Sequence, residues 1–352
     1  MKTINNLNEI PVRTWSWLKV NETSISFPID IKSTAPYEKG SFIAECTDNF
    51  KGFPKNYNAG EKIPEQIRCY IDENKNTSNY IHIHENEKLS KPLVKELVIP
   101  ENGNSIIGET IIFAEENSSA EIYITFKGNG QRAEIYEVYA GKNSNLKLVL
   151  IDALDEGAVN LDYTAVHCDE NANVNIIIVS AGSSKTISNC NIHLIGNESK
   201  AQIDSIYAGG KENIIDINYR VAHFGKNTVS NIVSKGSLSG KCRKVFRGTV
   251  DFISGCKGAD GKEEESTILL SPSAKNLSVP LLLCGEDDVA GAHAASVGKL
   301  DEMSMFYLMS RGISQQEAKK IMVEAQVAPI LEKLPFADMR EEIIILIHNK
   351  LN

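Results

Sequence analysis

The sequence predicts a mainly β protein with a helical C-terminal tail, and three observations support this prediction. Short runs rich in Ile, Val, Leu and Tyr recur between about residues 79 and 290. Gly, Asn, Asp and Ser separate these runs, for example at 128–130 and 209–210. After Val297 the pattern turns helical, with capping residues and an apolar stripe at helical spacing. Short β-branched runs with such breaks are typical of strands.

The first region, residues 1–75, is mixed in character and rich in turn-forming residues. Prolines interrupt it at positions 11, 28, 36, 54 and 64. Proline removes a backbone donor and disfavours the interior of both helices and strands. We therefore expect a short, partly helical N-terminal region, and we find no catalytic motif in it.

The central region, residues 76–296, contains the predicted strands. Clear examples are 80–84, 121–126, 146–151, 174–179 and 214–219. No helical period of useful length lies between them, which leaves a sandwich, a barrel or a β-solenoid. The region is long for one sandwich, and Asn, Gly and Ser at the breaks suit the tight corners of a solenoid. The sequence has no strict period, so the pattern alone leaves all three architectures open.

The third region, residues 297–352, is predicted to be a small helical domain. Asp301 is suited to cap a first helix that continues through Ser310, because a short polar side chain can accept from the first backbone N–H groups. Gly312 fits the position just past the end of this helix, where a left-handed backbone is common.

A second helix in this tail is predicted to begin at the capping box 314–317, where a Ser oxygen and a Glu carboxylate satisfy free backbone donors. Its apolar stripe is Ala318, Ile321, Met322, Ala325, Ala328 and Leu331. Pro335 is predicted to stop this helix. Residues 339–351 supply a further apolar run with charged edges, so we expect two or three helices in total.

The composition excludes several classes of protein. The chain has 352 residues and a net charge of −9, which argues against a nucleic-acid-binding body, because phosphate binding requires clustered Lys and Arg. No segment approaches the roughly 18 apolar residues of a membrane span, and the N-terminus lacks the apolar core of a signal peptide. We therefore expect a cytoplasmic protein. Its 7 widely spaced cysteines are expected to be free thiols.

Motifs of common enzymes are absent from the sequence. Residues 179–186 lack both glycines of a phosphate-binding loop, and 236–240 misplaces the serines of a nucleophile elbow. His82 and His84 are two apart and share one strand face, so they could chelate a metal, although an exposed polar strand face is the favoured interpretation. The pair 287–288 could bind a hard cation, but a turn that ends a strand explains it as well.

The segment from about 133 to 335 resembles the SufB/SufD family of iron–sulfur cluster assembly proteins. The resemblance is strongest in residues 271–274, 286–289, 292–301 and 306–313. Upstream, 245–248 and 258–260 resemble a strand pair of the family. The SufD branch is the closer one, because the cysteine-rich N-terminal elements of the longer SufB chains are missing here.

The resemblance implies a right-handed parallel β-helix core between a short N-terminal region and a C-terminal helical domain. It also implies a non-enzymatic scaffold that pairs with a SufB-like paralogue through the β-helix, with a homodimer possible in isolation. A SufC-like ATPase would dock on the C-terminal helices, in the region of Asp301, Phe306, Tyr307, Arg311 and Gly312. A transient iron–sulfur cluster is expected in the assembled complex, and none tightly bound to the isolated chain.

By the same resemblance, His293 occupies the position of the SufD histidine and would ligate the cluster at the junction of the two subunits. Histidine can replace thiolate on iron. Gly291 stands where the family usually has a cysteine, and Cys284 is the nearest thiol along the chain. Cys284 is therefore a candidate ligand, although a buried structural cysteine is the favoured interpretation. Residues 261–265 depart from the family and are predicted to form a solvated loop.

Two alternative functions remain open at this stage. One is a minimal homodimeric scaffold that works with the ATPase alone and supplies its own thiolates from Cys256 or Cys284. The other is a β-helix carbohydrate-active enzyme, which would need acidic residues stacked on one face. The sequence offers no clear stack of that kind.

Overall fold

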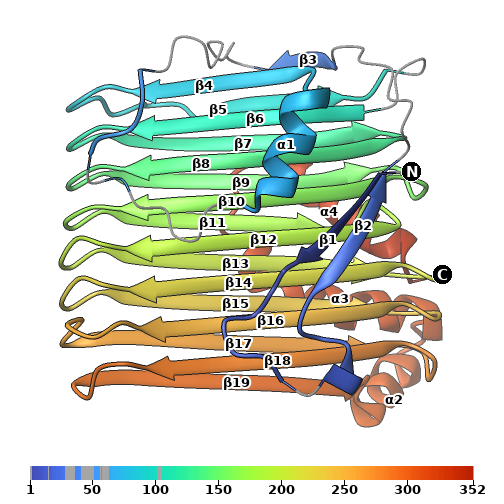
Figure 1. Ribbon diagram of the computed structural model, residues 1–352. Coiled ribbons are helices and arrows are strands. Elements are labelled where there is room, and N and C mark those ends of the chain that lie inside the picture. Colours follow the sequence, from blue (N-terminus) through green and yellow to red (C-terminus); the bar gives the residue numbers. More distant parts are fainter. Residues whose placement is uncertain are drawn as a thin grey trace.

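The computed structural model describes residues 2–14, 16–27, 36–40, 51–55, 57, 63–100 and 105–351. The chain winds back and forth between two facing sheets, so that consecutive strands alternate from one sheet to the other (Figure 1). From β4 (Thr77–Ile83) to β19 (Val289–Lys299), each strand pairs in parallel with the strand two places further on. This arrangement is a β-solenoid, so the predicted fold class is confirmed.

We call the two sheets the even sheet and the odd sheet, after their strand numbers. The even sheet contains β4, β6 (Ser105–Ala114), β8 (Gln131–Ala140), β10 (Val159–Cys168), β12 (Lys185–Leu194), β14 (Ile214–His223), β16 (Arg243–Phe252) and β18 (Lys275–Cys284). The odd sheet contains β3 (Tyr37–Gly40), β5 (Leu93–Val98), β7 (Ser119–Gly128), β9 (Asn145–Leu154), β11 (Asn173–Ser180), β13 (Lys200–Gly209), β15 (Val229–Leu238), β17 (Ala259–Leu269) and β19. Strand β3 pairs with β5 in the antiparallel sense and ends the odd sheet at the first turn of the solenoid.

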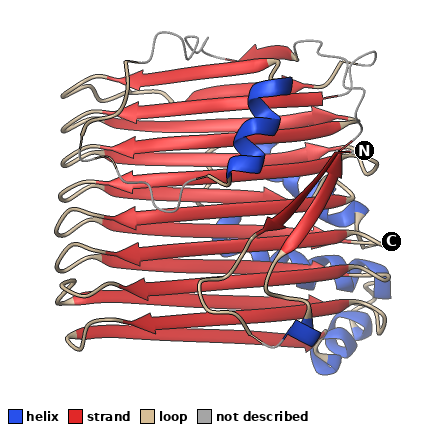
Figure 2. Cartoon of the chain, in the orientation of Figure 1, coloured by secondary structure: helices blue, strands red, loops and turns tan. Residues whose placement is uncertain are grey.

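Other elements cover the outer faces of both sheets (Figure 2). Helix α1 (Glu65–Asn74) and the antiparallel pair β1 (Lys2–Leu7) and β2 (Thr23–Phe27) lie on the even sheet, where Ile67 and Phe27 pack with Ile135. The short η1 (Ser16–Leu18) lies between β1 and β2 in sequence. Helices α3 (Gln315–Leu331) and α4 (Ala337–Asn349) lie on the odd sheet, where Val327 and Ile347 join the same apolar cluster as Ile177.

A column of asparagines stabilises the turns that lead from the even sheet to the odd sheet. Asn86, Asn117, Asn143 and Asn171 all have φ between 53° and 62°, which is the left-handed region that asparagine tolerates. Their amides are stacked from turn to turn, with Nδ2 to Oδ1 distances of 3.1, 3.0 and 2.9 Å. Each turn therefore satisfies part of the next, which explains why asparagine recurs at these breaks.

The predicted caps of the C-terminal helices are confirmed. Helix α2 (Glu302–Ser310) begins after Asp301, whose Oδ2 accepts from the backbone N–H of Ser304 at 2.7 Å. Gly312, at φ 89°, follows its end. Ser314 Oγ accepts from the N–H of Glu317 at 3.2 Å and starts α3. None of the described helices has both the length and the apolar character required to cross a bilayer.

The predicted apolar stripe of α3 is wrong in part. Ala318 and Leu331 are buried as expected, but the remaining buried positions are Val323, Val327 and Ile330, and Ile321 is exposed. The predicted residues Ile321, Ala325 and Ala328 instead line a groove beside α4. The burial of α3 is decided by the residues that meet the odd sheet, which local periodicity cannot identify. The helix ends at Leu331, before Pro335.

Candidate functional site

The last turn of the solenoid, β18 and β19, is open. Among the described strands, each of these two ends its sheet and pairs on one side only, with β16 and β17 respectively. Every residue of β19 after Val289 is exposed, and β18 is half-buried along most of its length. A row of unpaired backbone N–H and C=O groups on an exposed edge is a template for pairing with another strand.

His293 lies in the middle of this open edge. It is in register with Glu263 of β17, which in turn is in register with Ile232 of β15. Residues in direct register in parallel strands share a face, and Ile232 belongs to the interior cluster of the solenoid. His293 therefore faces the interior side, and it is exposed because no further turn covers it.

Glu263, the residue beneath His293, is a buried carboxyl with unused hydrogen-bonding capacity. Its side chain is 3% exposed, and neither carboxyl oxygen has a hydrogen-bond partner within the described residues. Burial and the neighbouring Glu265 raise its pKa to about 8, against a smaller opposing effect of Lys244. At neutral pH this carboxyl is therefore largely protonated.

A buried ion pair lies next to Glu263. Lys244 of β16 donates to Glu265 of β17, and neither side chain is exposed. Thr267 and Ser278 also donate to the Glu265 carboxylate. Burial lowers the pKa of Lys244, and Glu265 opposes this effect. The interior just below the open turn is therefore polar, whereas the interior at Ile176, Ile203 and Ile217 is apolar.

The predicted solvated loop at 261–265 is wrong. These residues lie within β17 and alternate between buried and exposed, with Gly261, Glu263 and Glu265 directed inward. A run of three glutamates is normally solvated because burying a carboxylate is costly without a partner. Here Lys244, which is distant in sequence, supplies the partner for Glu265 across the interior.

The candidate cysteines occupy the same end of the solenoid but do not assemble a ligand group with His293. Cys284 ends β18 in register with the interior residue Phe252 and is exposed, so the favoured interpretation of a buried cysteine at this position is wrong. Cys256 is buried in the preceding turn. The six described cysteines are free thiols, and Cys46 lies outside the described residues. In the described part of the chain, three His, Cys, Asp or Glu ligand atoms come within 4.8 Å of one another at one place. That place is in the first turns of the solenoid, away from His293.

Helix α2 follows the open turn directly and buries none of its residues. Phe306 and Tyr307 are 70% and 58% exposed, and the Arg311 guanidinium lies 5.3 Å from the centre of the Tyr307 ring. Asp301 and Gly312 serve this helix as its caps. Met305 and Leu308 of this helix are half-buried, and its other apolar side chains form an exposed surface next to the open turn.

A groove next to α2 extends this surface and contains residues that the sequence patterns did not single out. Its volume is about 540 Å³, and its lining includes Leu270, Pro272, Leu300, Met305, Phe306 and Met309. Met303, on the same helix, is 75% exposed. The sequence does contain one indication of this surface. The segment that forms α2 is apolar on all sides, whereas a helix with one buried face is apolar on that face alone.

A chain of contacts connects the helical tail to the open edge. Gln326 of α3 donates to the backbone carbonyl of Ser266 in β17 at 2.9 Å. The hydroxyl of Ser296 in β19 lies 3.1 Å from that of Ser266. Ser296 is three positions from His293 on the same strand. These contacts connect α3 to β17 and β19, the two strands that hold the candidate site.

Comparison with known proteins decides the family. Residues 97–326 match the model described as "SUF system FeS cluster assembly, SufBD core domain". The chain belongs to the SufBD family. This confirms the resemblance found in the sequence.

Curated members of the SufBD family are similar over most of this chain. The "Iron-sulfur cluster assembly protein SufD" of Bacillus subtilis is 27% identical over 284 residues, which is 78% of this chain and 64% of the relative. SufBD family proteins of Staphylococcus haemolyticus and Staphylococcus epidermidis are each 28% identical over 265 residues, or 73% of this chain and 56% of theirs. The chain thus spans less than two thirds of the length of these relatives.

Proposed function

We propose that this chain is a scaffold subunit of a SUF-type assembly system, of the SufD branch, which helps to hold an iron–sulfur cluster as cargo. The observation that carries the proposal is the open last turn, with two strands that each have one free edge and an exposed, inward-facing His293. A monomeric solenoid normally protects such an edge. An unprotected edge next to a metal-ligating side chain is what a subunit junction with a shared cargo site requires.

In this proposal a SufB-like paralogue pairs with β18 and β19 and continues both sheets. His293 then lies at the closed junction and provides an imidazole nitrogen to iron of the cargo cluster, while the partner provides further ligands. A site with few strong ligands can release its cluster to a recipient. Histidine on iron in place of thiolate is established chemistry for iron–sulfur centres.

A SufC-like ATPase is proposed to dock on α2 and its groove. Phe306, Tyr307 and Met309 would supply the apolar contact, since aromatic residues and Met are enriched in interfaces. Closure of the ATPase would pull on the helical tail. The contacts from Gln326 through Ser266 to Ser296 would transmit the pull to the strand that carries His293. The ATP hydrolysis itself would occur in the partner.

Co-expression of the full chain with its paralogue and ATPase tests this proposal. We expect a stable complex of the three proteins, and we expect His293→Ala to assemble the complex while cluster formation in it falls at least tenfold. Ala292→Ser, an exposed substitution one residue away, is the matched control and should leave cluster formation unchanged. If no complex forms, or if His293→Ala is as active as the control, the proposal is wrong.

The same experiment distinguishes the proposed heterodimer from the homodimeric alternative. The exposed edge can also pair with a second copy of this chain, and Cys284 would then be present twice at the junction. Cluster assembly by this chain with the ATPase alone, abolished by Cys284→Ser, would favour the homodimer. Cluster assembly that requires the paralogue would favour the heterodimer.

A further inference from the structure

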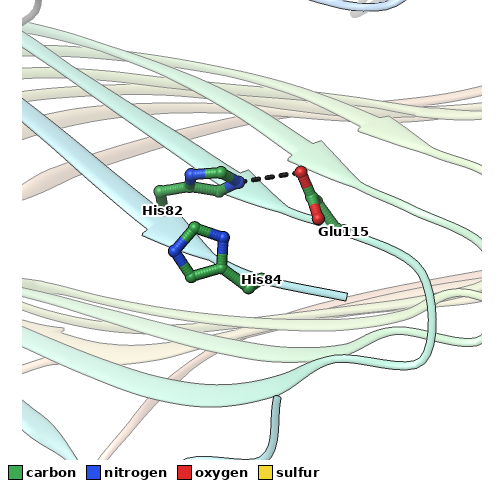
Figure 3. Close-up of side chains that lie close together, drawn as sticks. All are labelled: His82, His84 and Glu115. Atoms are coloured by element: carbon green, nitrogen blue, oxygen red, sulfur yellow. Dashed lines mark hydrogen bonds and ion pairs between the residues drawn. The ribbon is translucent and has the colours of Figure 1, made fainter. Parts of the chain in front are cut away.

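The first two turns of the solenoid bring three metal-ligating side chains together. His82 lies on β4, His84 follows the end of β4, and Glu115 follows the end of β6 (Figure 3). Their ligand atoms all lie within 4.8 Å of one another. Glu115 is distant in sequence from both histidines, so only the pairing of β4 with β6 creates this group.

Two of these three side chains are already held in position. His82 Nε2 lies 2.9 Å from Glu115 Oε1, and Glu115 Oε2 accepts from the backbone N–H of Glu85 at 2.9 Å. The His82 ring also packs against Phe113, with ring centres 5.3 Å apart. Metal-ligating side chains commonly have such outer partners, which fix their orientation.

The third side chain, His84, is exposed and close to the other two. Its ring centre lies 4.1 Å from that of His82. Its backbone N–H donates to the Glu87 carboxylate at 2.8 Å, which anchors the chain at this turn. A ring anchored at the backbone and exposed at its tip can rotate by the small amount that convergence on a metal requires.

A comparison within the solenoid shows what is special about the first turn. In the even sheet, His82 is in register with Phe113 and then with Tyr139. The Tyr139 hydroxyl donates to Asp169 at 3.2 Å, just as His82 contacts the carboxylate that follows the next strand. A ring–carboxylate contact at this register position therefore occurs twice in the sheet and does not by itself indicate a metal site. Tyr139 and Asp169 make this contact without a second imidazole, so the contact does not explain why His84 lies beside His82.

We propose that His82, His84 and Glu115 bind a divalent transition-metal ion of the Zn²⁺ class. Two imidazoles and a carboxylate suit Zn²⁺ and its neighbours, whereas Mg²⁺ and Ca²⁺ prefer oxygen ligands alone and Cu⁺ prefers sulfur. Zn–N and Zn–O bonds are about 2.0–2.2 Å long, so the ligand atoms need to be about 3.3 Å apart in a tetrahedral site. Three protein ligands leave a fourth position open for water or an exchangeable ligand.

The site is independent of the proposed scaffold function, because it lies in the first turns and His293 lies in the last (Figure 1). Calorimetric titration of the reduced, chelator-treated full chain with Zn²⁺ tests it. We expect His84→Ala and Glu115→Gln each to weaken one equivalent of binding at least tenfold. Asp169→Asn, which alters the equivalent carboxylate two turns further on, should bind like the wild type. His84 is exposed, so its substitution should leave folding intact.

Free thiols can also bind zinc, so Co²⁺ spectroscopy supplies a second measurement. A site of two imidazoles and one carboxylate gives d–d absorption without the thiolate-to-metal charge-transfer band. We expect this thiolate-free signal in the wild type and in Asp169→Asn, and its loss in His84→Ala. Equal binding by the wild type and His84→Ala, or a bound-metal spectrum that is entirely thiolate in character, would overturn the proposal.

Discussion

Two histidines that face the interior of the solenoid, His223 and His293, are in opposite situations. His223 ends β14 and is buried, with ring nitrogens 2.7 and 2.8 Å from the hydroxyls of Thr228 and Ser230. His293 has the same orientation on β19 but is exposed, with no turn beyond it. In a covered turn, His223 is a structural residue, and both of its ring nitrogens have hydrogen-bond partners. In the last turn, the His293 side chain is exposed and can contact a partner or a ligand.

The two ends of the solenoid differ in the same way. At the first turn, β3 adds an antiparallel strand to the odd sheet. At the last turn, β18 and β19 each have a strand on one side only among the described residues, while α3 and α4 cover the outer face of the odd sheet. The odd sheet therefore has an additional strand at its first edge and none, among the described residues, at its last edge. This difference supports the proposal that the last edge pairs with another subunit.

The largest effect is expected from the ion pair below the open turn. Lys244→Met leaves the Glu265 carboxylate buried beside Glu263 without its cation, and loss of one partner of a buried pair costs about 3–5 kcal/mol of unfolding free energy. Urea unfolding of the isolated chain measures this. Lys262→Met is the control, because its contact with Asp260 is exposed and such pairs contribute about 1 kcal/mol or less. Equal losses in both variants would show that the end of the solenoid is solvated throughout.

The next effect concerns pH and the covered histidine. Burial lowers the pKa of His223 from 6.5 to about 4. A lowered pKa in the folded state means that its contribution to stability is complete above pH 6.5 and is lost as pH falls through 4. We expect roughly 3 kcal/mol of unfolding free energy to depend on this group between pH 7 and pH 4.

Unfolding measured across this pH range for the wild type and His223→Asn checks this expectation. The stability advantage of the wild type over the variant should shrink as pH falls. His293→Asn, at the same face of the open turn, is the matched control. A constant difference between the wild type and His223→Asn at every pH would contradict the burial argument for His223.

The sequence predicted much of this molecule because its local signals agree with the fold. The β-runs, the caps at Asp301 and Ser314, and the resemblance around His293 all indicated elements that the structure contains. The asparagine column was visible only as scattered breaks, because the spacing between turns varies. Its regularity becomes clear once Asn86, Asn117 and Asn143 are seen stacked.

Features that depend on contacts between different strands could not be predicted in this way. The glutamates at 263 and 265 resembled a solvated loop because Lys244 lies on another strand. His82 and His84 resembled a polar strand face because Glu115 approaches only after β4 and β6 pair. In both cases the missing information was a partner brought close by the solenoid register, which single-sequence patterns do not contain.

The smallest of these effects concerns the open edge itself. Val297 of β19 is 48% exposed, and Val297→Lys places a charge on the edge that is proposed to pair with the paralogue. Charges on edge strands oppose strand addition, so we expect affinity for the paralogue to fall about tenfold, which corresponds to about 1.4 kcal/mol. Thermal unfolding of the isolated chain should change little. Binding of the purified paralogue measures the difference directly.

Val229 provides the matched control for this edge. It is 41% exposed, but it lies on β15, which has strands paired on both sides. Val229→Lys therefore adds the same charge to a similarly exposed valine away from the edge, and it should bind the paralogue like the wild type. If both variants lose the same affinity, the loss arises from charge in general, and if neither loses affinity, the paralogue does not bind at this edge. In either case the free edges of β18 and β19 would not be the junction, and the contrast between the closed and open turns would lose its functional meaning.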